Sequence, residues 1–241
     1  MSELKDKVEK YVKDYLKEYT PIKIRAPKVI HDPILGSNLF SAHEIAVLDL
    51  PLIQRLRRIS QVDLASLVFP SANHNRFEHT LGVAVLAGKF VNSLRKSGGD
   101  NKLIREQLEK IGWDFIYNHV RMAAIMHDCG HGPFSHMSEQ IYENFTDIKN
   151  IKPSNKKFAE GKAKAHEILS YFIVTSNAFK DFFSSEIASK YNVKNIDLEL
   201  VGNMIIGYVD DPKLAFMTNI INGAFDADKL DYIQRDGFRS R

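Results

Sequence analysis

Histidine and aspartate residues, which bind metals and move protons, gather in three separate segments of this sequence. The segments are "NHNRFEHTLG" (residues 73–82), "HDCGHGPFSH" (127–136) and "FDADKLDYIQRD" (225–236). In the second, His127 and Asp128 end an apolar run just before two glycines and a proline that stop a helix. At the last turn of a helix both side chains can reach one cation, which the helix dipole favours. This pair indicates a divalent ion such as Mn, Fe, Zn, Ni or Mg.

Two ligands are too few for a tight metal site, so further donors must come from the other two segments. His79 and one of three aspartates, Asp226, Asp228 or Asp231, could supply them. Each feature alone also has a purely structural interpretation. A His-Asp pair is often a surface pair, a single histidine often lies in a core, and an acidic run is often a solvated helix face. Together the three segments favour a metal centre.

Composition places the chain among ordinary globular proteins. It has 241 residues, of which 44% are hydrophobic and 26% are charged, enough for one large domain or two small ones. No stretch approaches twenty apolar residues, and the charged N-terminus lacks the apolar core of a signal peptide, so no membrane association is expected. The single cysteine, Cys129, fits a cytoplasmic location and small-residue packing. The net charge of +3 leaves nucleic-acid binding open.

The pattern along the chain predicts an all-α fold with one small β-hairpin. Residues 1–22 form an amphipathic helix, either packed on the surface or used in an oligomer contact, and 23–241 form the main domain. The hairpin is expected within residues 28–41, and the polar segment 149–166 is expected to be a solvated loop or a flap over an anionic ligand. Helices are predicted at 42–48, 51–61, 79–96, 101–111, 115–128, 137–145, 165–175, 179–191, 198–206, 212–222 and 226–235.

Several motifs, in order from Lys28 to Asp236, carry a family resemblance. They are "KVIHDPILG", "LDLPLIQRLRRISQ", "VFPSANHNRFEHTLGV", "IMHDCGHGPFSH", "AHE" and "FDADKLDYIQRD". With these motifs the sequence resembles the HD-domain metal-dependent phosphohydrolases, in particular their deoxynucleoside triphosphate (dNTP) triphosphohydrolase branch. The resemblance implies a compact helical bundle around one divalent ion. It also implies a reaction in which water attacks the α-phosphorus of a dNTP and inorganic triphosphate leaves the nucleoside.

The resemblance also implies roles for individual residues. The choice of Asp228 over Asp226 as a ligand rests on the family register, since spacing leaves both open. The implied metal ligands are His79, His127, Asp128 and Asp228. The implied catalytic residues are Asp128, His131, His136 and His166, with the histidines on the phosphate side of the site. The implied substrate-binding residues are Arg76 and Lys229 at the phosphates, and Gln61, Tyr232 and Asp236 at the deoxyribose.

A second nucleotide site and a homo-oligomer are further implications of the resemblance. Lys28, Asp49, Gln54 and Arg57 match positions that bind an activating nucleotide between subunits, although these residues could also simply support the fold. Family members usually continue with further helices beyond the last motif, whereas this sequence stops five residues after it. The sequence is therefore expected to be a fragment or a short member.

Two other functions remain open from the sequence. One is a different phosphohydrolase on the same scaffold, such as a nucleotidase, a phosphodiesterase or a single-strand nuclease, since metal ligands do not discriminate among these. The other is a non-catalytic nucleotide-binding or nucleic-acid-binding module. The match at the three sugar-binding positions favours the dNTP reaction.

Overall fold

A computed structural model describes residues 2–97, 102–160, 163–193 and 195–240. Helix α1 (Ser2–Lys17) lies within the segment predicted to form an amphipathic helix. Its apolar face, formed by Val8, Val12 and Leu16, is buried in the same hydrophobic cluster as the rest of the fold. The domain boundary after residue 22 stays a prediction.

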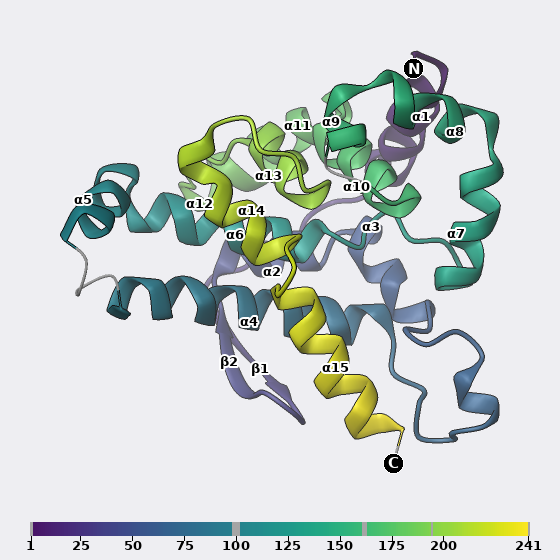
Figure 1. The fold of residues 1–241 in the computed structure, drawn as a ribbon, viewed down its shortest axis with the longest axis horizontal. Helices are drawn as coiled ribbons and strands as arrows, with labels where there is room; N and C mark the ends of the chain where they lie inside the picture. Colours follow the sequence, from purple (N-terminus) through teal and green to yellow (C-terminus); the bar gives the residue numbers. More distant parts are fainter. Residues whose placement is uncertain (1, 98–101, 161–162, 194, 241) are drawn as a thin grey trace.

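A β-hairpin follows α1, as the sequence predicted. Strands β1 (Lys28–Asp32) and β2 (Gly36–Phe40) pair antiparallel, with Lys28 opposite Phe40 and Asp32 opposite Gly36. The Oδ1 atom of Asp32 accepts hydrogen bonds of 2.8 Å from the backbone N–H groups of Ile34 and Leu35, which fixes the turn. In Figure 1 the hairpin projects beside α4 (Arg76–Ser97) and α15 (Ala227–Arg239).

Two long helices form the centre of the all-α fold. Helices α4 and α6 (Trp113–Met126) pack along each other, and α15 crosses α4. The last turns of α6 are apolar on all sides because α4, α13 (Leu198–Ile205) and α14 (Ala215–Ile221) surround this helix. This packing confirms the predicted helical bundle with a small hairpin, and it holds the end of α6 in the interior.

Shorter elements complete the fold, and one segment differs from its prediction. The polar segment 149–166, expected to be a loop, is helical over much of its described length because Ile148, Ile151 and Phe158 bury an apolar side. The remaining elements are α2 (Ala42–Leu48), α3 (Pro51–Gln54), α5 (Lys102–Ile111), α7 (Ser135–Asn144), α8 (Thr146–Ser154), α9 (Lys156–Glu160), α10 (Ala165–Thr175), α11 (Asn177–Phe182) and α12 (Ser189–Tyr191), with helical turns η1 (Arg55–Arg58), η2 (Ala65–Leu67), η3 (Phe183–Ala188) and η4 (Pro212–Leu214). Within the described ranges, no helix is long and apolar enough to cross a membrane.

Candidate metal centre

His127 lies where α6 ends, and its two ring nitrogens have different environments. Its Nδ1 is 2.7 Å from the carbonyl oxygen of Ala124. A carbonyl can only accept, so Nδ1 carries the proton and the lone pair of the neutral ring is on Nε2. That Nε2 is buried without a hydrogen-bond partner in the described structure, and lies 3.3 Å from Oδ1 of Asp128. Two electron-rich atoms that face each other in this way are the arrangement that a bound cation satisfies.

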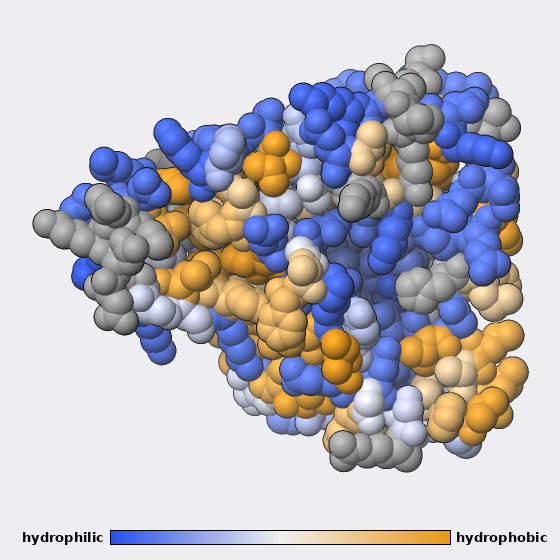
Figure 2. All heavy atoms as spheres, viewed as in Figure 1, coloured by the Kyte–Doolittle hydropathy of each residue, from blue (hydrophilic) through white to orange (hydrophobic). Residues whose placement is uncertain are grey.

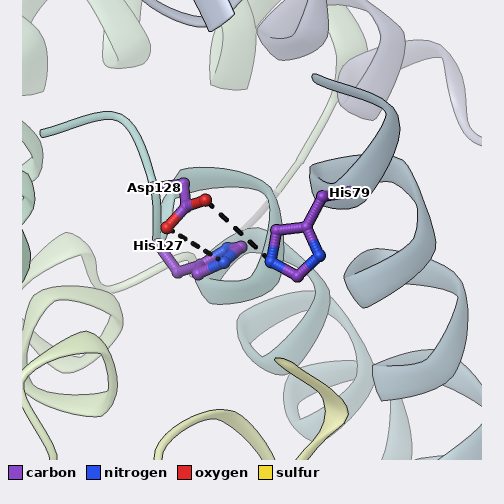
Figure 3. Close-up of side chains that lie close together, drawn as sticks. All are labelled: His79, His127 and Asp128. Carbon is purple, nitrogen blue, oxygen red and sulfur yellow. Dashed lines mark ion pairs between the residues drawn. The ribbon is translucent and has the colours of Figure 1, made fainter. Parts of the chain in front are cut away.

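His79, in the first turn of α4, brings a second imidazole to the same place. Its Nε2 lies 3.9 Å from Oδ2 of Asp128 and 2.9 Å from Oδ1 of Asp228. His79, His127 and Asp128 are all buried, and their ligand atoms lie within 4.8 Å of one another. Figure 3 shows the three side chains pointing toward one another from α4 and the end of α6. Imidazole nitrogens with carboxylate oxygens suit one borderline divalent ion, so the residues present fit such a cofactor.

The structure separates the three aspartates that spacing had left open. Asp226 caps the N-terminus of α15, where its carboxylate accepts from the backbone N–H and, at 2.6 Å, from Nζ of Lys229. Asp228 faces Nε2 of His79 on the metal side, while Asp231 accepts from Nδ1 on the other side at 2.8 Å. The geometry therefore favours Asp228 as the fourth ligand, and its role stays a prediction.

Charges in the cluster are strongly coupled. Burial lowers the pKa of His79, but the hydrogen bonds that its ring donates to Asp228 and Asp231 outweigh burial and raise that pKa to about 10. Burial alone would raise the pKa values of Asp128 and Asp228; the positive charges of Arg76 on Asp128 and the hydrogen bond of His79 to Asp228 hold both well below their usual range. Before an ion binds, a proton on His79 therefore balances part of the negative charge of the carboxylates. The same negative charge would favour a bound cation.

A polar cavity of about 340 Å³ adjoins the cluster. Figure 2 shows a recessed hydrophilic area at the corresponding place, among α4, α7 and α15. The cavity brings together most of the residues that the family resemblance singled out, although these lie in five separate parts of the sequence. Its lining includes Gln61, Arg76, Asp128, His131, His166, Asp228, Tyr232 and Asp236 together with Val62, Asp63 and Lys164.

Two residues that were predicted to face the substrate are not seen in the cavity lining. Lys229 does not line this cavity, because its ammonium group is held by Asp226 and by the carbonyl oxygen of Gly223 at 2.8 Å. The side chain of His136 lies outside the part of the chain that the structure describes, although its backbone belongs to α7. The assigned roles of both residues stay predictions.

Glu139 is a site residue that the sequence alone did not reveal. Its Oε2 lies 2.8 Å from Nδ1 of His166, whose ring stacks on that of His131 with centroids 3.8 Å apart. Burial raises the pKa of Glu139, but the hydrogen bond and charge of His166 lower it to about 2. Burial, followed by the charge of His166, holds the pKa of His131 well below its ordinary value, so His131 is neutral. The available signal was an acid one helical turn after His136.

The candidate regulatory residues lie away from this cavity. Nε of Arg57 donates to Oε1 of Gln54 at 2.7 Å, and its guanidinium covers the ring of Phe77 at 3.7 Å. Lys28 begins β1 and Asp49 follows α2. The structure thus brings Gln54 and Arg57 together, and a nucleotide at these four positions stays a prediction.

Sequence comparison identifies the class to which this fold and site belong. The family model described as HD domain matches residues 76–236, which include every predicted metal ligand. The chain therefore belongs to the HD domain family, whose members are metal-dependent phosphohydrolases, and its His/Asp cluster can hold one divalent ion.

Curated relatives share the same region. The chain is 31% identical over 234 residues to the mouse protein named deoxynucleoside triphosphate triphosphohydrolase SAMHD1, covering 92% of this chain and 33% of that protein. The human protein of that name is 30% identical over 240 residues, with 92% and 35% covered. The homolog from Dictyostelium discoideum is 29% identical over 221 residues, with 89% and 37% covered. The chain thus spans about a third of the length of these relatives.

Proposed function

We propose that this protein hydrolyses dNTPs in a reaction that depends on one divalent metal ion and releases a deoxynucleoside and inorganic triphosphate. The observation that carries the proposal is the shared cavity. In it the predicted ligands Asp128 and Asp228 adjoin Arg76 and the histidines His131 and His166, while polar residues suited to a sugar line the same space. The names of the mouse, human and Dictyostelium relatives support the dNTP as substrate.

The phosphate side of the cavity provides charge and hydrogen-bond donors. A bound divalent ion would polarise a phosphoryl oxygen and acidify a water molecule. Arg76 is buried, with Nη1 2.6 Å from Oδ2 of Asp128, so its guanidinium is fixed beside the candidate ion and can stabilise phosphate charge. The carboxylate of Glu139, 2.8 Å from Nδ1 of His166, orients the ring at the edge of the cavity.

Proton balance gives the histidines a definite task. The new bond joins a water oxygen to the α-phosphorus, and the bond from that phosphorus to the 5′ oxygen breaks. The 5′ oxygen must then receive a proton, for which an imidazole is the suitable group at neutral pH. We assign this donation to His136, with His131 and His166 holding the phosphates.

The opposite side of the cavity offers groups for the deoxyribose. Tyr232 and Asp236 lie one turn apart on α15 and line the cavity together. Asp236 is held by a 2.8 Å contact with Nε2 of His74. Gln61 is buried, and its Oε1 has no hydrogen-bond partner in the described structure, so a sugar hydroxyl would satisfy it.

Product analysis tests the proposed reaction. The protein loaded with Mn²⁺ is incubated with each of the four dNTPs and rNTPs, with and without GTP, and products are separated by anion-exchange chromatography. Equal amounts of triphosphate and deoxynucleoside are expected. Release of orthophosphate or pyrophosphate would instead indicate another HD phosphohydrolase, and bound nucleotide without turnover would indicate a binding module.

Variants link that activity to the metal centre. His127→Ala and Asp128→Ala should each abolish turnover, because each removes a ligand. His43→Ala is a matched control, since His43 is a partly buried histidine on α2 whose ring contacts Ser41 at 3.1 Å, outside the cavity. The GTP arm tests the predicted regulatory site at Lys28, Asp49, Gln54 and Arg57.

Self-association is also part of the proposal. Leu64, Leu67, Val68 and Phe69 around η2 are between 48% and 79% exposed, and an apolar patch on the lower right of Figure 2 matches the place of this turn. Contiguous exposed apolar side chains are typical of interaction surfaces. Light scattering should therefore detect a homo-oligomer, and Leu67→Asp should shift it toward the monomer.

A further inference from the structure

A buried ion-pair network begins in the β-hairpin and ends at the metal centre. Arg235 on α15 is fully buried, and its Nε and Nη2 each donate to a different carboxylate oxygen of Asp231 at 2.8 Å. Its Nη1 donates to Oδ2 of Asp32 at 2.9 Å. Asp32 is the last residue of β1, so the guanidinium joins the hairpin to the C-terminal helix.

The network continues to a predicted metal ligand. Oδ2 of Asp231, which accepts from Arg235, also lies 2.8 Å from Nδ1 of His79. The other nitrogen of His79 faces Asp128 and Asp228. A carboxylate on the outer nitrogen of a ligand histidine fixes the ring orientation and increases its basicity toward the metal. Asp32, Arg235, Asp231 and His79 thus form one continuous buried network.

Stability alone is a poor reason for such a network. Desolvation of buried ion pairs costs as much as their attraction returns, and apolar residues would pack as well. Two carboxylates and one guanidinium also leave a net negative charge in the interior, which a cation at His79 would neutralise. In the metal-free protein the proton on His79 supplies this positive charge, and a bound cation would replace it.

Asp32 divides its carboxylate between two tasks. Oδ1 accepts the two backbone hydrogen bonds that form the hairpin turn, and Oδ2 receives Arg235. A shift of the turn therefore displaces the guanidinium directly. Close packing transmits that shift, since a Cβ atom at Gly82 of α4 would collide with Asp231 and with Arg235.

We infer that Asp231 and Arg235 are positioning residues for the metal ligand His79, and that Asp32 couples the β-hairpin to the metal centre. The inference rests on the metal centre of the proposed function. Coupling is reciprocal: if the position of the hairpin affects ion binding, ion binding must stabilise the hairpin position that favours it.

The first test measures the dissociation constant for Mn²⁺ from the electron paramagnetic resonance signal of the free ion. Asp231→Asn should raise this dissociation constant about 10-fold to 100-fold, as expected when a ligand histidine loses the hydrogen-bond partner of its outer nitrogen. Asp32→Asn should give a smaller rise, because the pair of Asp231 with Arg235 remains. Thermal melting of the metal-free variants checks that each one folds.

A matched control exists in the same fold. Glu44 on α2 and Arg121 on α6 form another buried ion pair, with Nη2 of Arg121 3.1 Å from Oε2 of Glu44, and neither residue belongs to the His/Asp cluster. Glu44→Gln removes one buried carboxylate from an arginine, as Asp32→Asn does, and should leave the dissociation constant for Mn²⁺ unchanged. An equal rise in both variants would reduce the effect to general destabilisation and overturn the inference.

The second test measures amide hydrogen exchange of peptides that cover residues 28–40, with and without Mn²⁺. Mn²⁺ should slow exchange in the wild-type protein and in Glu44→Gln, and should not slow it in Asp32→Asn. Unchanged hairpin exchange in a wild-type protein that binds Mn²⁺ overturns the coupling while the proposed function stands. A wild-type protein that binds no Mn²⁺ overturns the metal centre and the inference together.

Discussion

At the residue scale, the centre depends on which nitrogen of each histidine carries a proton. Nδ1 of His127 donates a hydrogen bond to the carbonyl oxygen of Ala124, and Nδ1 of His79 donates one to Asp231. Nε2 of His127 is thereby available to an ion, and Nε2 of His79 becomes available once the ion displaces its proton. If Nδ1 of either ring accepted a hydrogen bond instead, the ring proton would lie on Nε2, which would then have no lone pair for the ion.

Metal affinity should increase with pH. The pKa of His79 is about 10 before an ion binds, so Mn²⁺ must displace its proton at neutral pH. The dissociation constant should fall about tenfold for each pH unit between about 6.5 and 8.5, with about one proton released per ion. Calorimetric titration in buffers of different ionisation enthalpy measures this release, and a value near zero contradicts the assignment.

The same raised pKa stabilises the protein before metal is added. The pKa of His79 is higher in the folded protein than in the unfolded chain, so protonation of His79 stabilises the folded state. This contribution is fully present below the ordinary histidine pKa near 6.5 and is lost as the pH rises through about 10. In a chelator the melting temperature should therefore fall between pH 7 and pH 10.5. A control melt of His79→Gln, which lacks this titration, should show a smaller fall over the same range.

Glu139→Gln should reduce turnover about tenfold or more, because it removes the carboxylate that orients His166. The folded pKa of Glu139 is about 2, so its stabilising contribution is present above about pH 4.5 and is lost as pH falls toward 2. Urea unfolding at several acid pH values should show a weaker pH dependence in the variant. Glu143→Gln, an exposed position one turn further along α7, should leave both turnover and this dependence unchanged.

At the element scale, helix ends and one close crossing position the site. His127 and Asp128 are placed by the end of α6, His79 by the start of α4, and Asp228 by the first turn of α15. Helices α4 and α15 must also cross closely enough for Asp231 to reach His79. Gly82 makes that approach possible, since it has no side chain at the crossing.

Gly82→Ala should weaken metal binding and lower the melting temperature, because the new methyl group displaces Asp231 and Arg235 from buried hydrogen bonds. A cost of about 1–3 kcal/mol is typical for such overpacking. Gly88→Ala on the same helix is the control. The nearest atom to its new methyl group would be Nη1 of Arg121, at 3.1 Å. The two variants are compared by thermal melting and Mn²⁺ titration, and equal affinities for Mn²⁺ would contradict this role of Gly82.

At the scale of the whole molecule, one ion would join segments that are far apart in sequence. Its predicted ligands come from residue 79, residues 127–128 and residue 228, and Figure 1 shows the three supporting helices meeting at the middle of the fold. A ligand that binds only the folded state stabilises it by mass action.

Mn²⁺ at about 100 times its dissociation constant should therefore raise the free energy of unfolding by about 2.7 kcal/mol. For a chain of this size, that corresponds to a rise in melting temperature of about 5–10 °C. Differential scanning fluorimetry with Mn²⁺ and with a chelator measures the change. His127→Ala should show no metal-dependent shift, and a full shift in that variant would place the ion elsewhere.

The sequence by itself determined the helical class, the hairpin and the three segments that carry chemistry. Periodicity, prolines and glycines are local signals, and they predicted the end of α6 at the His-Asp pair. Resemblance in several ordered motifs added a prediction of which residues are the ligands. Local signals failed at residues 149–166, where a few apolar side chains among many lysines form helices because the surrounding core buries them.

Only the tertiary structure decided how the aspartates of α15 divide their tasks, because ring orientation and helix crossing are long-range properties. It placed Asp226 at a helix cap, Asp228 beside the inner nitrogen of His79 and Asp231 behind the outer one. It also revealed Glu139 behind His166, and Arg235 between α15 and the hairpin, contacts that join residues 27 and 203 positions apart in the sequence. Sequence spacing carries no information about such contacts, since packing of the whole chain determines them.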